Sequence, residues 1–297
     1  MIRHPLAAVA FAVFAIAVFG QKADDVKKQK AAAEEAMKSA KVDKPTLHET
    51  DALLVYSSLP AEKLKPLAES AQATFAFTAK ALKLDGKDAK LWPGKLTVYA
   101  LPDRTKEFVP FLKLVEQRSG KLDADEIISL KLRGNEPYAA VGRTQAAKGA
   151  NLEESVSQAV AMALLNQKAG APSVPFSLPT WLETNFGMIA TYRAEKSGKS
   201  LAAFKVRTAQ YFTKSKIGLF KADDAWSDKT YAGLDTIKLS LVDYLAFGPD
   251  AEKFEKFVTG FRPNDQRSDP DVGSALEAAG LKADELDVAW KKWVMKK

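Results

Sequence analysis

The helical periodicity that begins at Asn151 and continues to the end of the chain is the feature that most constrains the fold. Apolar residues recur there about every three or four positions, which is typical of helices that bury one face. Before Asn151 the apolar residues fall instead in short runs separated by turn residues, which is typical of strands. The sequence therefore predicts an α+β fold, with a small mixed sheet and helices in the N-terminal half and an all-helical C-terminal half.

Apolar runs and turn signals place the elements expected in the N-terminal half. Alternating or continuous apolar runs predict strands, and helical spacing of apolar residues predicts helices. The expected strands are residues 52–57, 95–101, 127–132 and 138–143, and the expected helices are residues 64–84 and 105–119. The last two strands flank a turn at Gly134-Asn135, which favours a β-hairpin.

The C-terminal half opens with two helices whose boundaries carry capping signals. Asn151 is a good N-cap, and the helix after it is apolar nearly all round, which predicts a buried helix. A proline-rich loop over residues 170–179 leads to Thr180-Trp181-Leu182-Glu183, which matches the capping box of a helix expected to run to Ala194. Further helices are expected over residues 201–214, 230–247, 251–259, 273–279 and 284–296.

The composition removes several classes of chemistry. The 297 residues include no cysteine and only two histidines, which excludes a thiol nucleophile, a disulfide framework and a zinc site built from cysteines or several histidines. His48 is followed four positions later by Ala52, so it does not begin a metal-binding HExxH motif, and we expect a surface histidine. The net charge is +7, but the lysines are scattered rather than grouped with aromatic residues, which argues against nucleic acid as a partner.

The N-terminal segment has the pattern of an export signal. After a short basic start, the charge-free run Leu6–Gly20 is shorter than the roughly 20 apolar residues that a membrane-crossing helix needs. We therefore expect residues 1–20 to be a signal peptide, cleaved before Gln21, and the protein to be periplasmic or extracellular. An uncleaved signal anchor is the alternative, and membrane contact is expected only in that case. Residues 21–50 are rich in Ala, Lys and Glu and are expected to form a charged helical linker.

Motifs in the remaining chain resemble those of one enzyme family. The buried helix reads Val156-Ser157-Gln158-Ala159-Val160-Ala161-Met162, and the next helix begins Pro179-Thr180-Trp181-Leu182-Glu183-Thr184-Asn185-Phe186-Gly187. The tail carries Asp243-Tyr244-Leu245 with Phe247-Gly248, and Leu286 followed by Trp290 and Trp293. Together these resemble the gluzincin metallopeptidases, and more narrowly the peptidase-MA-like members common among exported proteins of planctomycete-type bacteria. The resemblance covers residues 51–297 and implies a thermolysin-like fold, with an α/β half over 51–198 and a helical half over 199–297.

Carried over residue by residue, the resemblance implies that the zinc site has been lost. In the family the buried helix carries HExxH, and a glutamate at the start of the next helix is the third ligand. Gln158 and Met162 stand at the two histidine positions. Ala159 replaces the general-base glutamate, and Thr184 occupies the position of the third ligand. Because zinc needs three good ligands to lower the pKa of its bound water, we expect neither a metal nor another cofactor.

The residues around the lost site have two interpretations. Gln158 and Met162 are either packed in the core or line a metal-free cleft. In the second case, the cleft would be completed by Ala159, Trp181, Glu183 and Thr184. Glu183 lies one position before the expected ligand, a rotation of about 100° on a helix, so the capping box accounts for it better than a metal does.

Two functions from different classes follow. The favoured one is an exported, catalytically inactive metallopeptidase-like protein that acts as a binding or scaffold protein of the cell envelope, with a peptide or an envelope protein as its partner. The alternative is an exported hydrolase that uses carboxylates or a non-standard metal site in the same cleft. Asp265, Asp269 and Asp271 share a polar loop that could hold a hard cation, but a solvated turn into the next helix is the simpler interpretation.

Overall fold

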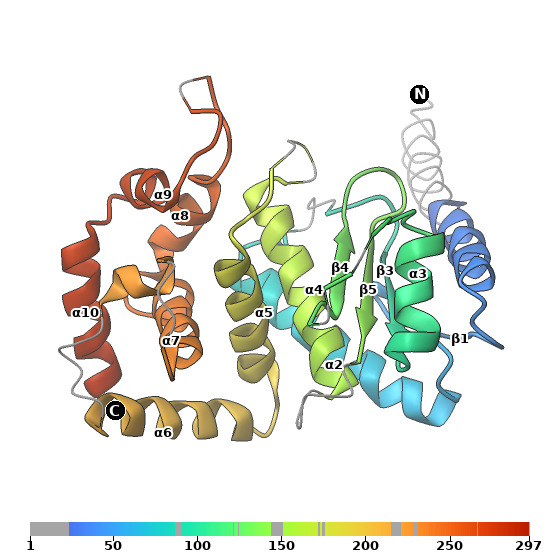
Figure 1. The fold of residues 1–297 in the computed structure, drawn as a ribbon, viewed down its shortest axis with the longest axis horizontal. Helices are drawn as coiled ribbons and strands as arrows, with labels where there is room; N and C mark the ends of the chain where they lie inside the picture. Colours follow the sequence, from blue (N-terminus) through green and yellow to red (C-terminus); the bar gives the residue numbers. More distant parts are fainter. Residues whose placement is uncertain are drawn as a thin grey trace, which may run out of the picture. The chain divides into compact units, whose positions relative to one another are not determined.

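The structure is a computed structural model, and its fold is mixed α+β, as the sequence predicts (Figure 1). It describes residues 24–86, 91–120, 122–123, 125–143, 151–171, 173, 176–214, 221–227, 231–265 and 267–296. The chain divides into two compact units. The first comprises the described residues of 1–68 and 90–149, and the second those of 69–89 and 150–297. The expected signal peptide lies outside the described residues.

The first unit is built on a five-stranded sheet in the order β1-β2-β3-β5-β4. Its strands are β1 (Thr46–Glu49), β2 (Leu53–Ser57), β3 (Leu96–Leu101), β4 (Ile128–Lys131) and β5 (Tyr138–Gly142). The three central strands run parallel, while β1 and β4 pair antiparallel at the edges. Because β2, β3 and β5 are buried along their whole length, their sequences are nearly continuous apolar runs. The antiparallel pairing of β4 with β5 confirms the expected hairpin.

A cluster of aromatic rings covers one face of this sheet. The ring centroid of Tyr99 lies 5.4 Å from that of Tyr138 and 6.3 Å from that of Tyr56, on the two neighbouring strands. Phe111 of α3 (Val109–Leu114) packs onto the same ring at 4.6 Å. Edge-on and tilted contacts of this kind stabilise a core beyond the area that they bury.

The helix expected over residues 105–119 is shorter and begins irregularly. It opens with a turn of π-helix, η1 (Arg104–Phe108), which is capped by the Asp103 side chain and continues directly into α3. α3 ends at Leu114. The backbone of Gln117 has a positive φ of 55°, a conformation that a right-handed helix does not contain.

Residues 24–39 form a helix that belongs to the core of the first unit. Ala33, Met37 and Ala40 are buried in the same cluster as the aromatic residues of the sheet. The structure therefore differs from the solvated linker expected over residues 21–50. The physical reason for this difference is a narrow stripe of small and apolar side chains at helical spacing. This stripe becomes a buried face only because the sheet covers it.

Gln29 fixes this helix to the start of β3. Its side-chain amide donates hydrogen bonds to the carbonyls of Pro93 (2.8 Å) and Lys95 (2.9 Å), and its side-chain oxygen accepts one from the Lys95 amide at 3.0 Å. Gln29 is 2% exposed, so these bonds satisfy a buried polar group. On the surface of the same helix, Lys30 forms an ion pair with Glu49 of β1.

Every named element of the second unit is a helix, which agrees with the expected all-helical C-terminal half. α2 (Ala61–Ala81) begins in the first unit, and its residues from Glu69 onward belong to the second. The other helices are α4 (Leu152–Ala169), α5 (Thr180–Ala194), α6 (Lys199–Lys214), η3 (Ala222–Ala225), α7 (Leu234–Phe247), η4 (Ala251–Lys253), α8 (Phe254–Thr259), α9 (Val272–Ala279) and α10 (Ala283–Met295).

α4 is buried along most of its length, as its sequence predicts. The side chain of Asn151 caps it by accepting a hydrogen bond from the Glu153 amide, and Gly170 ends it in the left-handed conformation with a φ of 80°. α5 lies against α4, and α7 lies against α5 (Figure 1). Within the described residues, no helix combines the length and the apolar character that crossing a membrane requires.

Candidate functional site

α4 and α5 meet at the residues that the resemblance associates with a lost zinc site. At Gly187 of α5, an added Cβ would lie 2.7 Å from Met162 Cγ and 2.8 Å from Gln158 Cγ, both on α4. The missing side chain of Gly187 therefore lets the two helices approach closely here. Gln158 and Met162 are each 8% exposed, so their side chains are packed in the helix interface.

The Gln158 amide makes a specific contact across this interface. Its Nε2 donates a hydrogen bond of 3.2 Å to the backbone carbonyl of Thr184, which is half-buried in α5. This bond satisfies a polar group that is mostly removed from water. The structure thus brings Gln158, Met162 and Thr184 together, although helix periodicity alone does not require it.

The capping box expected at Thr180 is absent. Pro179 is the N-cap of α5, no side chain caps the helix there, and Thr180 is exposed as its first residue. Pro179 suits this place because it has no amide hydrogen and its fixed φ is compatible with a helix start. The expected role of Glu183 as a capping partner is therefore wrong.

Glu183 instead turns toward α4. Its carboxylate accepts a hydrogen bond from the side-chain amide of Asn166, which also donates to the Met162 carbonyl at 2.9 Å. Burial raises the pKa of Glu183, and the hydrogen bond from Asn166 opposes this only in part. Sequence reasoning missed Asn166. Its signal was a polar residue one turn after Met162, on the same face of the helix as Gln158.

Ala159 and Trp181 complete the residues expected around the site. Ala159 is fully buried in α4. The ring of Trp181 lies 5.8 Å from that of Trp226, and its indole Nε1 is buried without a hydrogen-bond partner in the described part of the chain.

A cavity of about 440 Å³ lies at the other end of the same helix pair. Three segments that are distant in sequence form its walls: α2, the first turn of α4, and the end of α5 with the loop that follows. Its acidic and hydroxyl-bearing residues include Glu69, Thr74, Glu153, Glu154, Tyr192 and Glu195. A concave space between these helices therefore exists about one turn of α4 away from Gln158.

Burial and hydrogen bonds set the acidity of the groups in this cavity. Burial raises the pKa of Glu154, while a hydrogen bond with Tyr192 works in the opposite direction. Burial also raises the pKa of Tyr192, whose hydroxyl interacts with Arg207 of α6 as well. Hydrogen bonds, first among them that from Ser197, lower the pKa of Glu195. The cavity therefore holds carboxyl groups of unequal acidity.

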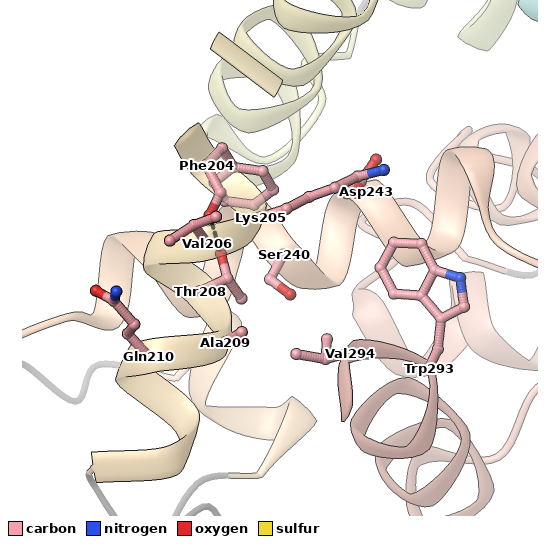
Figure 2. A pocket seen from close by; sticks show the side chains of 10 residues that line it. All are labelled: Phe204, Lys205, Val206, Thr208, Ala209, Gln210, Ser240, Asp243, Trp293 and Val294. Atoms are coloured by element: carbon pink, nitrogen blue, oxygen red, sulfur yellow. Dashed lines mark hydrogen bonds between the residues drawn. The ribbon is translucent and has the colours of Figure 1, made fainter. Parts of the chain in front are cut away.

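A second cavity, of about 260 Å³, lies among α6, α7 and α10 (Figure 2). Its lining is largely apolar, with Phe204 of α6 and Val294 of α10 among the contributing side chains. Asp243 of α7 is 1% exposed and pairs with Arg193, whose Nε and Nη2 lie 2.7 and 2.6 Å from Asp243 Oδ1. The Arg193 guanidinium also stacks over the ring of Phe247, so the carboxylate that lines this cavity is already paired within the protein.

No three His, Cys, Asp or Glu side chains among the described residues lie close enough together to hold a metal ion. In the loop with three aspartates, Asp271 has a structural role. Its Oδ1 accepts hydrogen bonds from the backbone amide and the hydroxyl of Ser274, at 2.9 and 3.0 Å, and so caps α9.

The chain was also compared with known proteins. Neither a protein-family model nor a curated protein matches it.

Proposed function

We propose that this chain is an exported, catalytically inactive metallopeptidase-like protein that binds a peptide or an envelope protein. The observation that carries the proposal is the α4–α5 interface, where Gln158 and Met162 face Gly187 and the Gln158 amide bonds to Thr184. The gluzincin family places its zinc ligands at three of these positions. An amide that is already hydrogen-bonded and a soft thioether are poor zinc ligands, so we infer that the interface serves packing rather than hydrolysis.

The finer fold assignment is part of the same proposal. The order of a small mixed sheet, the buried helix α4, the adjacent helix α5 and a helical tail is that of the gluzincin family. In the tail, Tyr244 and Trp293, which belong to two of the motifs that carry the resemblance, have ring centroids 5.7 Å apart. These contacts support a thermolysin-like arrangement without depending on a metal.

The cavity beside α2 supports the binding part of the proposal. Its volume of about 440 Å³ lies within the range of about 300–1,000 Å³ in which ligand sites usually fall. A peptidase-like frame that keeps a concave site next to a lost metal centre is able to hold a peptide without cleaving it. We therefore assign binding to this cavity.

Incubating the mature chain with peptide and glycan libraries, with and without a chelator, tests this proposal. We expect bound peptides to be recovered intact, less than stoichiometric zinc in the purified protein, and a melting temperature that chelation leaves unchanged, because a structural metal would stabilise the fold. Chelator-sensitive turnover, or tightly bound zinc at one ion per chain, would contradict the proposal.

Export is proposed on the pattern of residues 1–20. Mass spectrometry of the secreted or periplasmic form should find a chain that begins at or near Gln21. A chain with an intact Met1 in the membrane fraction would show that the segment stays as an anchor, and a chain found only in the cytoplasm would contradict export.

Glu183 favours the alternative, an exported hydrolase that uses carboxylates. Burial raises its pKa, which is the property of a carboxyl that acts as a general acid near neutral pH. If this alternative holds, the parent chain cleaves a library member without needing a metal, and Glu183→Gln abolishes cleavage. Absence of turnover in the parent chain would exclude the alternative for the substrates tested.

A further inference from the structure

We propose that the cavity lined by α2, α4 and the end of α5 binds lysine or arginine side chains of a peptide segment. The proposal rests on the binding function proposed above and gives that function a ligand class. Three observations carry it: the charges around the cavity, a hydroxyl in its wall that bonds to no described residue, and a cation of the protein beside it.

Most of the charged residues that line this cavity are glutamates. Glu69, Glu153, Glu154 and Glu195 contribute to it, against Lys196 as the lining residue of opposite charge. In the described part of the chain, Glu153 and Glu154 form no ion pair with a lysine or an arginine. Hydrogen bonds and, to a smaller extent, the charge of Lys199 lower the pKa of Glu195. Because the whole chain carries a net charge of +7, the cavity is opposite in sign to the molecule around it and attracts positive charge.

The charges are spread around the cavity rather than gathered at one point. No three acidic or histidine side chains of the described residues are close enough to share a metal ion. The volume of about 440 Å³ also suits an extended organic ligand better than a bare ion. A peptide segment with successive basic side chains provides positive charge over such a distance.

Thr74 of α2 provides an unused hydrogen-bonding group in the wall. It is 2% exposed and lines the cavity, and its hydroxyl makes no hydrogen bond to the described part of the chain. In contrast, the hydroxyls of Thr191 and Thr208 donate to the carbonyl four residues earlier in their helices, both at 2.9 Å. Ammonium and guanidinium groups carry only donors, which the Thr74 oxygen is able to accept.

Arg207 of α6 places a cation of the protein beside Tyr192 in this wall. Burial and the charge of Glu154 raise the pKa of the Tyr192 hydroxyl, and the charge of Arg207 lowers it. The surroundings of Tyr192 therefore already combine a basic side chain with a carboxylate. A basic side chain of a ligand inside the cavity would use the same carboxylate and add to this arrangement.

Titrating a fluorescently labelled hexalysine peptide into the mature chain tests the proposal. We expect saturable binding that the double variant Glu153→Gln/Glu154→Gln weakens by about tenfold, because two attractive charges are lost. The matched control is Glu252→Gln/Asp269→Asn, which removes the same charge from two exposed residues outside the cavity. We expect this control to change the affinity by less than about twofold at physiological salt.

Further variants separate effects on binding in the cavity from effects on folding. Glu195 lies outside the helices, and Glu195→Gln should weaken binding in the same direction. Lys196→Gln should strengthen binding. Thr74→Val keeps the shape of the side chain and removes the hydroxyl, so it should weaken binding by about threefold without lowering the melting temperature. A melting curve for each variant confirms that it is folded.

Several results would overturn the proposal. Equal weakening by the cavity variant and the control would mean that binding is nonspecific, and tighter binding of free spermidine than of hexalysine would exclude a peptide as the ligand. If hexalysine does not bind while other library peptides bind and stay intact, the ligand class is wrong and the binding function stands. Cleavage of the bound peptide would instead contradict the proposed function itself.

Discussion

The side-chain amide of Asn166 in α4 donates a hydrogen bond to the carboxylate of Glu183 in α5. The same amide donates to the Met162 carbonyl at 2.9 Å, so this pair joins the two helices beside the residues that the resemblance associates with zinc. Burial raises the pKa of Glu183 despite the hydrogen bond. Ionisation of this carboxyl therefore lowers the stability of the fold.

Replacing Glu183 with glutamine should stabilise the protein more at about pH 7.5 than at about pH 4. Because the pKa of Glu183 is raised in the folded state, folding takes up protons, and stability falls as the pH rises from the ordinary value of 4.5 through the raised one. Glutamine does not titrate and is able to accept the same hydrogen bond from Asn166. Urea unfolding at both pH values measures the effect, with the exposed Glu252→Gln as control. A stability difference that does not change with pH would contradict this account.

Gly187→Ala should destabilise the protein by about 1–3 kcal/mol, although alanine is the better helix former. The new Cβ would lie 2.7 Å from Met162 Cγ and 2.9 Å from the Gln158 carbonyl oxygen. Thermal and urea unfolding measure the loss. Shortening the neighbour in the double variant Gly187→Ala/Met162→Ala should cost less than the sum of the two single changes, because the added methyl then has room. Simple additivity would contradict the close packing of α4 on α5.

Met37→Ala tests whether residues 24–39 belong to the folded unit. Met37 is fully buried in the aromatic core, so its truncation should cost about 2–5 kcal/mol in the free energy of unfolding. The adjacent Lys38 has an 80% exposed side chain, and Lys38→Ala should change stability by less than about 0.5 kcal/mol. Urea unfolding of both variants makes the comparison. Similar small effects would restore the interpretation of this segment as a linker.

Arg193→Met should destabilise the second unit by about 3–5 kcal/mol, because it removes the guanidinium that pairs with the buried carboxylate of Asp243. Methionine keeps the apolar stem of the side chain, so the loss reports on the ion pair and on the stacking of the guanidinium over Phe247. Replacing both residues, as Arg193→Met/Asp243→Leu, should cost less than the single change. A single variant as stable as the parent would contradict the role of this ion pair.

Much of the fold follows from patterns within single segments. The cap at Asn151, the continuous burial of α4 and the apolar runs of β2 and β3 depend on local sequence, and the structure contains them. The face that residues 24–39 bury could not be predicted from local sequence, because small residues such as Ala33 indicate a core face only when their packing partners are known. Those partners are tyrosines of strands that come later in the chain.

The site was less predictable because its contacts cross between helices. The capping motif at Thr180 agrees with local statistics, but Glu183 bonds to Asn166, 17 residues earlier. The cavity is formed by α2, α4 and the end of α5, so no local pattern indicates Thr74 as part of its wall. Among the contacts of this site, only the pairing of Gln158 with Thr184 could be predicted from the sequence. That prediction rested on the resemblance rather than on helical periodicity.

The central claim is that α4 and α5 hold the remains of a metal site. The most direct test of this claim is to rebuild the zinc ligands. The variant is Gln158→His/Met162→His/Thr184→Glu, which leaves the fully buried Ala159 unchanged because a charged side chain there would endanger folding. The double variant without Thr184→Glu is the matched control.

Zinc affinity, measured by competition with a chromophoric chelator on protein shown to be folded by circular dichroism, is the decisive quantity. The account predicts micromolar or tighter binding of one zinc ion by the triple variant, weaker binding by the double variant, and no comparable binding by the parent chain. A folded triple variant whose zinc affinity equals that of the parent would contradict the claim.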